Sequence, residues 1–295
     1  MIGALRDELR RTNFAGREVS LAEGALVTGG VVALSLRTGR VVDPCVLAGI
    51  GTLGMIDDLL EPRQRRAGRP VSKGLRGHLG TLLEGQLTTG AAKALGIPLL
   101  SLTGALAAPA PRGRAMMLVD AALVAGCANL ANLLDLRPGR ALKAALPPAA
   151  LLLLVPARAD RHRADRDRAD SGCADRGRTG RQLALAALLP GLLALPADLR
   201  ERGMLGDAGA NVLGAAVGSA ATRVLPAPAR ISLLAAVVAL TLASEKVSFS
   251  AVIDSTAPLR RLDHLGRLPV ATAGPGPTAG PGATAGASPA AEEER

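Results

Sequence analysis

Acidic side chains that could bind a cation and meet phosphate groups stand at the ends of apolar stretches in this chain. Asp57 and Asp58 lie side by side after the apolar run Val41–Ile56, and Asp207 lies in GDAGAN at the start of another. Carboxylates at the rim of a membrane can hold a divalent cation without the full cost of burial in hydrocarbon. The pair predicts cation-assisted phosphate chemistry; a helix-end pair that faces water is the alternative interpretation.

Amides and cations accompany these carboxylates. Asn129, Asn132 and Asp135 end another apolar stretch at a spacing of three, which makes successive members neighbours on a helix. Asn side chains at such positions could also join helices by hydrogen bonds, and Asp207 could be only a helix N-cap. Lys73 lies in the basic loop after the Asp pair, where binding to lipid head groups is the alternative. His264 could be an ordinary surface residue.

The elements that must position these residues are predicted to be membrane-spanning helices. Hydrophobic residues make up 48% of the chain and are grouped in long blocks. We therefore expect an all-α, polytopic transmembrane bundle of about eight spans. The predicted spans are Leu21–Leu36, Val41–Ile56, Leu95–Ala110, Ala115–Leu134, Ala144–Ala157, Leu183–Leu195, Ala208–Leu225 and Ile231–Leu242.

The distribution of charge argues for a membrane and against nucleic acid. The net charge is +10, but the chain has no Trp or Tyr and only two Phe, so it lacks aromatic platforms for bases. Lys and Arg concentrate in the connectors on the Asp57 side, which predicts that this face is cytoplasmic in a multi-pass protein of the plasma membrane. The connector Arg158–Arg181, rich in both Arg and Asp, departs from this pattern.

Three regions are expected along the chain. Residues 1–20 form a cytoplasmic segment without the apolar core of a signal peptide, residues 21–267 form the transmembrane domain, and residues 268–295 form a Pro/Gly/Ala-rich tail that is too poor in packing residues to fold. Asp43 and Asp120 lie roughly 20 Å from the cytoplasmic rim, at about 1.5 Å per helical residue, so they are placed outside the site.

The ordered motifs GMIDD, KGLRGH, ANLANLLD and GDAGAN, followed by EK and a basic segment with His264, resemble a known superfamily. These are the polyprenyl-phosphate N-acetylhexosamine-1-phosphate transferases, which include phospho-N-acetylmuramoyl-pentapeptide transferase and its GlcNAc-1-phosphate relatives. The resemblance covers roughly residues 13–267. An Asp pair alone is a weak signal, whereas the order and sidedness of the whole set is specific.

The resemblance implies transfer of a sugar phosphate from a UDP-sugar to a polyprenyl phosphate, with release of UMP, in cell-envelope glycan synthesis. It implies that Asp57, with Asp58, handles the acceptor phosphate and that Asp207 binds Mg²⁺, for which Mn²⁺ could substitute. Asn129, Asn132 and Asp135 match residues of the nucleotide-sugar pocket, and Lys73 and His264 match other substrate-binding positions. The expected partners are both substrates and membrane lipids, and a homodimer is compatible with the sequence.

The chain also departs from the family pattern. Pro138 stands where the family has a second Asp, His264 alone represents a His-rich motif, and the family usually has ten or more spans. A catalytically degenerate homologue that binds lipid phosphate or scaffolds envelope assembly is therefore the second hypothesis. A transporter, the third, would place ionisable residues at mid-span rather than at one rim.

Overall fold

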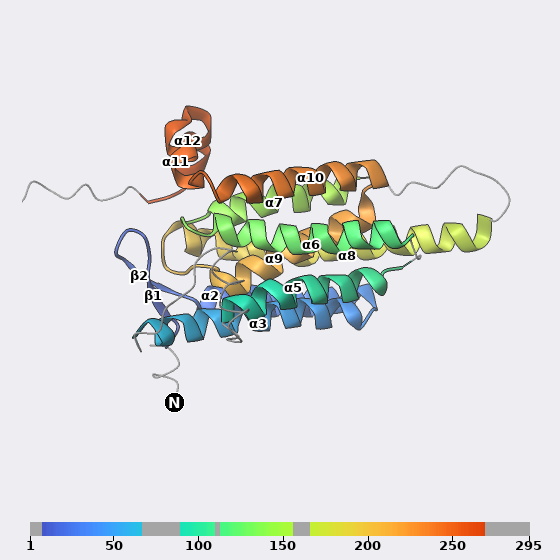
Figure 1. Ribbon diagram of the computed structural model, residues 1–295, viewed down its shortest axis with the longest axis horizontal. Coiled ribbons are helices and arrows are strands. Elements are labelled where there is room, and N and C mark those ends of the chain that lie inside the picture. Colours follow the sequence, from blue (N-terminus) through green and yellow to red (C-terminus); the bar gives the residue numbers. More distant parts are fainter. Residues whose placement is uncertain (1–7, 67–88, 110–112, 156–165, 269–295) are drawn as a thin grey trace, which may run out of the picture.

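The computed structural model describes residues 8–66, 89–109, 113–155 and 166–268 of the 295-residue chain. The predicted site residue Lys73 and the predicted disordered tail from residue 269 onward lie outside the described residues. Within them the fold is an all-helical bundle with one short hairpin (Figure 1). The elements are β1 Arg10–Thr12, β2 Glu18–Ser20, α2 Ala22–Ser35, η1 Leu36–Thr38, α3 Val42–Arg66, α5 Thr89–Leu106, α6 Arg114–Leu134, α7 Arg140–Leu154, α8 Arg166–Leu199, α9 Gly206–Val224, α10 Ala227–Ser244, α11 Phe249–Ser255 and α12 Ala257–His264.

Helix α9 is the centre of the bundle, with nearly every residue buried and with α2, α3, α6, α7 and α8 packed around it. Its small residues permit this crowding. A Cβ on Gly214 would stand 2.3 Å from the Cys127 carbonyl oxygen, and one on Gly209 would stand 2.8 Å from the Cα of Gly24. Close helix approach through Gly and Ala is typical of membrane bundles, where apolar side chains gain little by leaving lipid.

Each of the eight predicted apolar blocks overlaps one helix, from α2 to α10, and consecutive helices run in opposite directions (Figure 1). Two helices are longer than expected. α3 continues past Ile56 to Arg66, and α8 begins at Arg166, inside the stretch interpreted as a connector, rather than at Leu183. The Arg/Asp-rich sequence sustains this extension through pairs such as Asp175 and Arg178, which are 2.6 Å apart at i,i+3.

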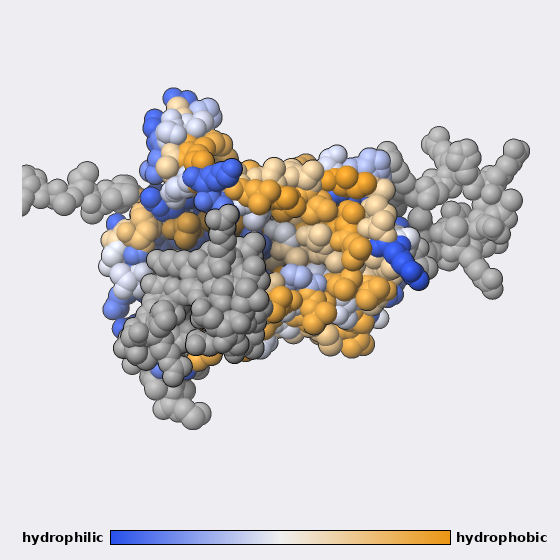
Figure 2. All heavy atoms as spheres, in the orientation of Figure 1, coloured by the Kyte–Doolittle hydropathy of each residue, from blue (hydrophilic) through white to orange (hydrophobic). Residues whose placement is uncertain are grey.

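Four helices in the described part of the chain are long and apolar enough to cross a membrane: α5, α6, the Ala174–Leu199 part of α8, and α10. Large apolar side chains are exposed along the bundle. Much of the described surface on the face shown in Figure 2 is hydrophobic. Exposed apolar area of this extent is unusual in soluble proteins. The fold therefore indicates a membrane-associated protein. α2 and α7, with 14 and 15 residues, are shorter than the roughly 20 residues that a spanning helix prefers.

The bundle has two chemically different ends. The first collects the β1–β2 hairpin, the ends of α3, α6 and α8, the starts of α5, α7 and α9, and the pair α11–α12 (Figure 1). The hairpin is fixed there because Ser20 pairs with Gly203 and accepts a hydrogen bond from the Met204 amide at 3.1 Å. We call this the acidic end, and the opposite one, which holds Asp43 and Asp120, the far end.

Candidate functional site

The contact between α3 and α9 at the acidic end is built around Asp58. Its two carboxylate oxygens accept hydrogen bonds from the backbone amides of Asp207 and Ala208, each at 3.0 Å. α9 has no side-chain cap of its own, so a carboxylate from another helix satisfies its free amides and its positive dipole end. Gly206 makes room for this contact, because it has a φ of 59° and its Cβ would stand 2.9 Å from an Asp58 oxygen.

Asp57 and Asp207 are joined by a cation that was not predicted from the sequence. The Lys93 ammonium, near the start of α5, lies 2.8 Å from an Asp57 oxygen and also forms an ion pair with Asp207. The Asp57 side chain is 10% exposed and that of Asp207 is 23% exposed. Three helices that are distant in sequence therefore deliver two carboxylates and one ammonium to a single, mostly buried point.

Further carboxylates follow this point in a chain, since Asp135 interacts with Asp207, Asp198 with Asp135, and Glu23 with Asp198. Within the described residues none of these three forms an ion pair. Asp135 ends α6, and its Oδ2 atom is buried without a hydrogen-bond partner. Burial, together with the carboxylates of Asp198, Asp207 and Asp58, raises the pKa of Asp135 well above its usual value. Asp198 and Glu23 also have buried, unpartnered oxygens. Buried unpaired acceptors are costly, so this acidic cluster favours binding of a cation or of protons.

The pKa values of the two α9-linked carboxylates report the same surplus of negative charge. Burial raises the pKa of Asp207 to about 7, against the opposing influence of Lys93. Burial also raises the pKa of Asp58 to about 6, although the amides of Asp207 and Ala208 stabilise its charged form. An added cation would stabilise the ionised forms of both groups.

Basic residues border the cluster on the side of α7 and α12. Arg140, at the start of α7, makes a bidentate pair with Asp263 of α12 at 2.8 and 3.2 Å. Arg267 bonds the same carboxylate at 2.6 Å. The guanidinium groups of Arg137 and Arg267 lie 4.2 and 5.5 Å from the centre of the Phe14 ring. The hairpin and α12 thus meet over the α6–α7 turn, and most of these cations are already partnered.

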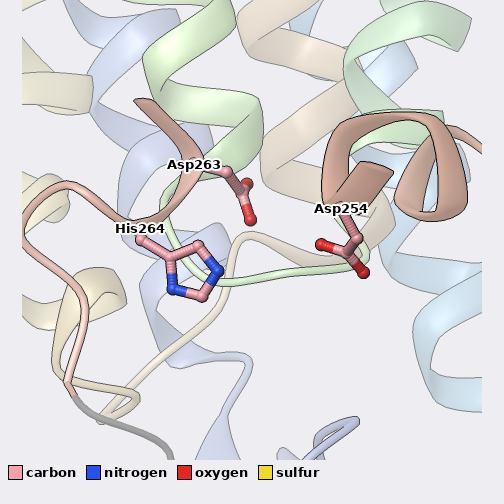
Figure 3. A group of neighbouring side chains, drawn as sticks. All are labelled: Asp254, Asp263 and His264. Carbon is pink, nitrogen blue, oxygen red and sulfur yellow. The ribbon is translucent and has the colours of Figure 1, made fainter. Parts of the chain in front are cut away.

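A second acidic group on α11 and α12 has the outline of a metal site (Figure 3). Ligand atoms of Asp254, Asp263 and His264 lie within 4.8 Å of one another. Burial alone would raise the pKa of Asp263, but the hydrogen bond from Arg140 and the charges of Arg140 and Arg267 lower it. A metal ion would have to displace these two guanidinium groups, so the triad is better explained as part of an Arg–Asp network.

Of the predicted site residues that the structure describes, the carboxylates lie together and the others lie apart from them. Asp57, Asp58, Asp135 and Asp207 lie together in the acidic cluster. Asn132 is half-buried, Asn129 is exposed on the last turns of α6, and His264 is exposed on α12 beside the Arg–Asp network. Sequence reasoning missed Lys93, Asp198 and Glu23. Lys93 carried a usable signal, because an ionisable residue at the edge of an apolar stretch is a default functional candidate.

Comparisons of the chain with protein-family models, with curated proteins and with solved structures found no match.

Proposed function

We propose that this protein is a membrane phosphotransferase that moves a sugar-1-phosphate, of the N-acetylhexosamine type, from a UDP-sugar to polyprenyl phosphate at the cytoplasmic face. The observation that carries the proposal is the Asp57–Lys93–Asp207 arrangement, held at one end of a membrane bundle by the Asp58 cap. A lipid acceptor requires a site at the membrane rim, and a reaction between two phosphorylated substrates requires cations there.

The donor set fits a divalent cation. Mg²⁺ binds one or two carboxylates and takes its other ligands from water and substrate phosphates. Asp207 would hold it, with Mn²⁺ as a substitute, and the unpartnered oxygen of Asp135 offers a further carboxylate ligand nearby. When bound, the cation would neutralise part of the negative charge of the substrate phosphates.

In this proposal each residue has a distinct task. A phosphate oxygen of the acceptor attacks the phosphorus next to the sugar; a new P–O bond forms, the P–O bond to the uridylyl group breaks, and UMP leaves with that electron pair. Asp57 orients the acceptor phosphate, and Lys93 binds the donor diphosphate once it leaves its carboxylate partners. Asp58 acts as a positioning residue, because both of its oxygens are engaged by α9. Asn132 and Asp135 line the nucleotide-sugar pocket.

A UMP-release assay with purified protein, polyprenyl phosphate and a panel of UDP-sugars tests the proposal. We expect Mg²⁺-dependent UMP release that Asp207→Asn and Lys93→Met each reduce at least about 100-fold, the magnitude usual for charge-stabilising groups. Asp175→Asn is the matched control, because it removes one carboxylate from an exposed pair on α8. Full activity of Asp207→Asn would overturn the assignment of the metal site.

One observation favours a catalytically degenerate homologue as the second candidate. Lys93 already forms ion pairs with both Asp57 and Asp207, so these carboxylates have a cationic partner without a divalent cation. Pro138, in place of the family's second Asp, and the exposed His264 point the same way. This candidate predicts binding of polyprenyl phosphate without nucleotide binding or UMP release. Isothermal titration with the UDP-sugars separates it from the enzyme, because tight nucleotide binding contradicts it.

A further inference from the structure

The α11–α12 pair stands out from the side of the bundle at the acidic end, beyond α10 (Figure 1). It follows α10 after a short turn and is tied to the bundle through its polar groups. Arg140 bonds Asp263 and Ser250, and Lys143 donates to the Leu262 and Asp263 carbonyls at 3.1 and 2.6 Å. These bonds fix which face of the pair meets α7 and which faces are left outside.

The outward faces of α12 and the turn after it are divided between leucines and cations. Leu259, Leu262 and Leu265 recur at a spacing of three and are 42%, 57% and 66% exposed. Arg260 and Arg261 are exposed on the adjoining arc of the helix, since consecutive helical residues are turned by about 100°. In Figure 2 the orange surface of the pair faces toward the α10 side, and the blue surface faces away. The exposed surface of α12 is therefore amphipathic, as is typical of helices that lie at a membrane interface.

Apolar side chains are exposed both on α10 and on the residues that lead into the pair, with the exposed charges of Glu245 and Lys246 between them. Val238, Leu240 and Leu242 on α10 are 45%, 46% and 63% exposed, and Val247 and Val252 carry this surface into α11 at 48% and 40%. α10 is also the candidate span with the smallest buried share, 11%. A segment that follows the end of a membrane-spanning helix lies at the level of the lipid head groups.

We propose that α11–α12 is an interfacial membrane anchor that lies on the cytoplasmic leaflet beside α10 and binds anionic phospholipid. Its leucines enter the boundary between head groups and acyl chains, and Arg260 and Arg261 meet the lipid phosphates. Anionic lipid is the expected occupant because the exposed cations of α12 complement it, as does the net charge of +10. The inference rests on the membrane placement of the bundle and not on the transferase activity.

Because the natural chain contains no Trp or Tyr, a single introduced Trp is a unique reporter. The test compares Leu262→Trp with Arg261→Trp, its neighbour on the adjoining cationic arc, in full-length protein reconstituted into bilayers of phosphatidylcholine with or without phosphatidylglycerol. Quenching by lipids brominated near the head group is measured against quenching by aqueous acrylamide. Both positions are exposed, so the substitutions leave the bundle packing intact, which circular dichroism checks.

We expect the ratio of lipid to aqueous quenching to be several-fold higher for Leu262→Trp than for Arg261→Trp, and to rise with phosphatidylglycerol. Adding Arg260→Gln to Leu262→Trp should remove most of that rise. Equal quenching of both variants by acrylamide alone would overturn the proposal. So would a Leu262→Trp signal shielded from both quenchers in proportion to protein density, because that result indicates a second copy of the chain.

Discussion

The two ends of the bundle differ in how many cationic partners their buried carboxylates have. At the far end Asp43 pairs with Arg223 at 2.9 Å, and Asp120 pairs with Arg230 at 2.6 and 2.8 Å, all with side chains 8% exposed or less. At the acidic end Asp57 and Asp207 share the Lys93 ammonium, and within the described part of the chain Asp58 and Asp135 form no ion pair. Matched charges lock helices together, whereas a surplus of one sign leaves capacity for a ligand.

A small cavity lies beside the far-end pairs and is lined by Asp43, Asp120, Arg176 and Arg223 together with apolar side chains such as Leu47 and Leu183. Each pair joins helices that are far apart in sequence: α3 to α9, and α6 to α10. These partners hold the outer ends of α9 and α10 in place. We therefore expect the far end to be structural and the acidic end to bind a ligand, and each of the following changes tests one of these expectations.

The largest effect on stability is expected at the far end. Asp43→Asn leaves the Arg223 guanidinium buried without its counter-charge and should lower the free energy of unfolding by about 3–5 kcal/mol. Replacing both partners, with Asp43→Leu and Arg223→Met together, should recover most of that loss. Unfolding followed by far-UV circular dichroism in detergent measures both. A single variant as stable as the natural chain would contradict the structural role.

At the acidic end the largest stability effect is expected from the Asp58 cap. Asp58→Ala removes the acceptor of two α9 amides, and we expect a loss of about 1–2 kcal/mol in the free energy of unfolding. Because α9 carries Asp207, kcat should fall while KM for the acceptor changes little. Asp58→Asn keeps one carbonyl acceptor and should restore part of both. An Asp58→Ala variant with unchanged stability and altered KM alone would instead make Asp58 a substrate ligand.

Magnesium should change how stability depends on pH. The pKa values of Asp207 and Asp58 in the folded chain, about 7 and about 6, lie above the ordinary value for Asp of about 4. The folded state therefore binds more protons than the unfolded chain between these values. Without metal, this stabilisation is complete below about pH 4 and is lost as the pH rises through the folded pKa values.

Mg²⁺ binds the ionised carboxylates, so it should flatten this decline and stabilise the protein by about 1.4 kcal/mol at tenfold excess over its Kd. Melting curves from pH 5 to 8, with chelator or with Mg²⁺, measure the difference. Asp254→Asn, which changes an exposed carboxylate on α11, is the control and should behave like the natural chain. A Mg²⁺ effect that survives intact in Asp207→Asn would place the ion elsewhere.

The sequence predicted the all-α fold class and an apolar segment within each long helix, because long apolar blocks favour helices. Of the eight predicted spans, four correspond to helices in the described residues that are long and apolar enough to cross a membrane. The sequence also placed Asp43 and Asp120 away from the site. The ion pairs of Lys93 could not be predicted, because its partners Asp57 and Asp207 are 36 and 114 positions away in the sequence. The hairpin and α12 were missed for a similar reason: both are short and are stabilised by contacts such as Phe14–Arg137 and Arg140–Asp263.

The smallest effect on stability is expected at Asn129, which is exposed on α6 one turn before the half-buried Asn132. Asn129→Ala should change the free energy of unfolding by less than about 0.5 kcal/mol, as is usual for surface positions. If both amides contact the donor, Asn129→Ala and Asn132→Ala should each raise KM for the UDP-sugar and leave Mg²⁺ binding unchanged. A change in stability without a change in KM would make these amides interhelical contacts. The proposed binding site would then consist of the carboxylates and Lys93.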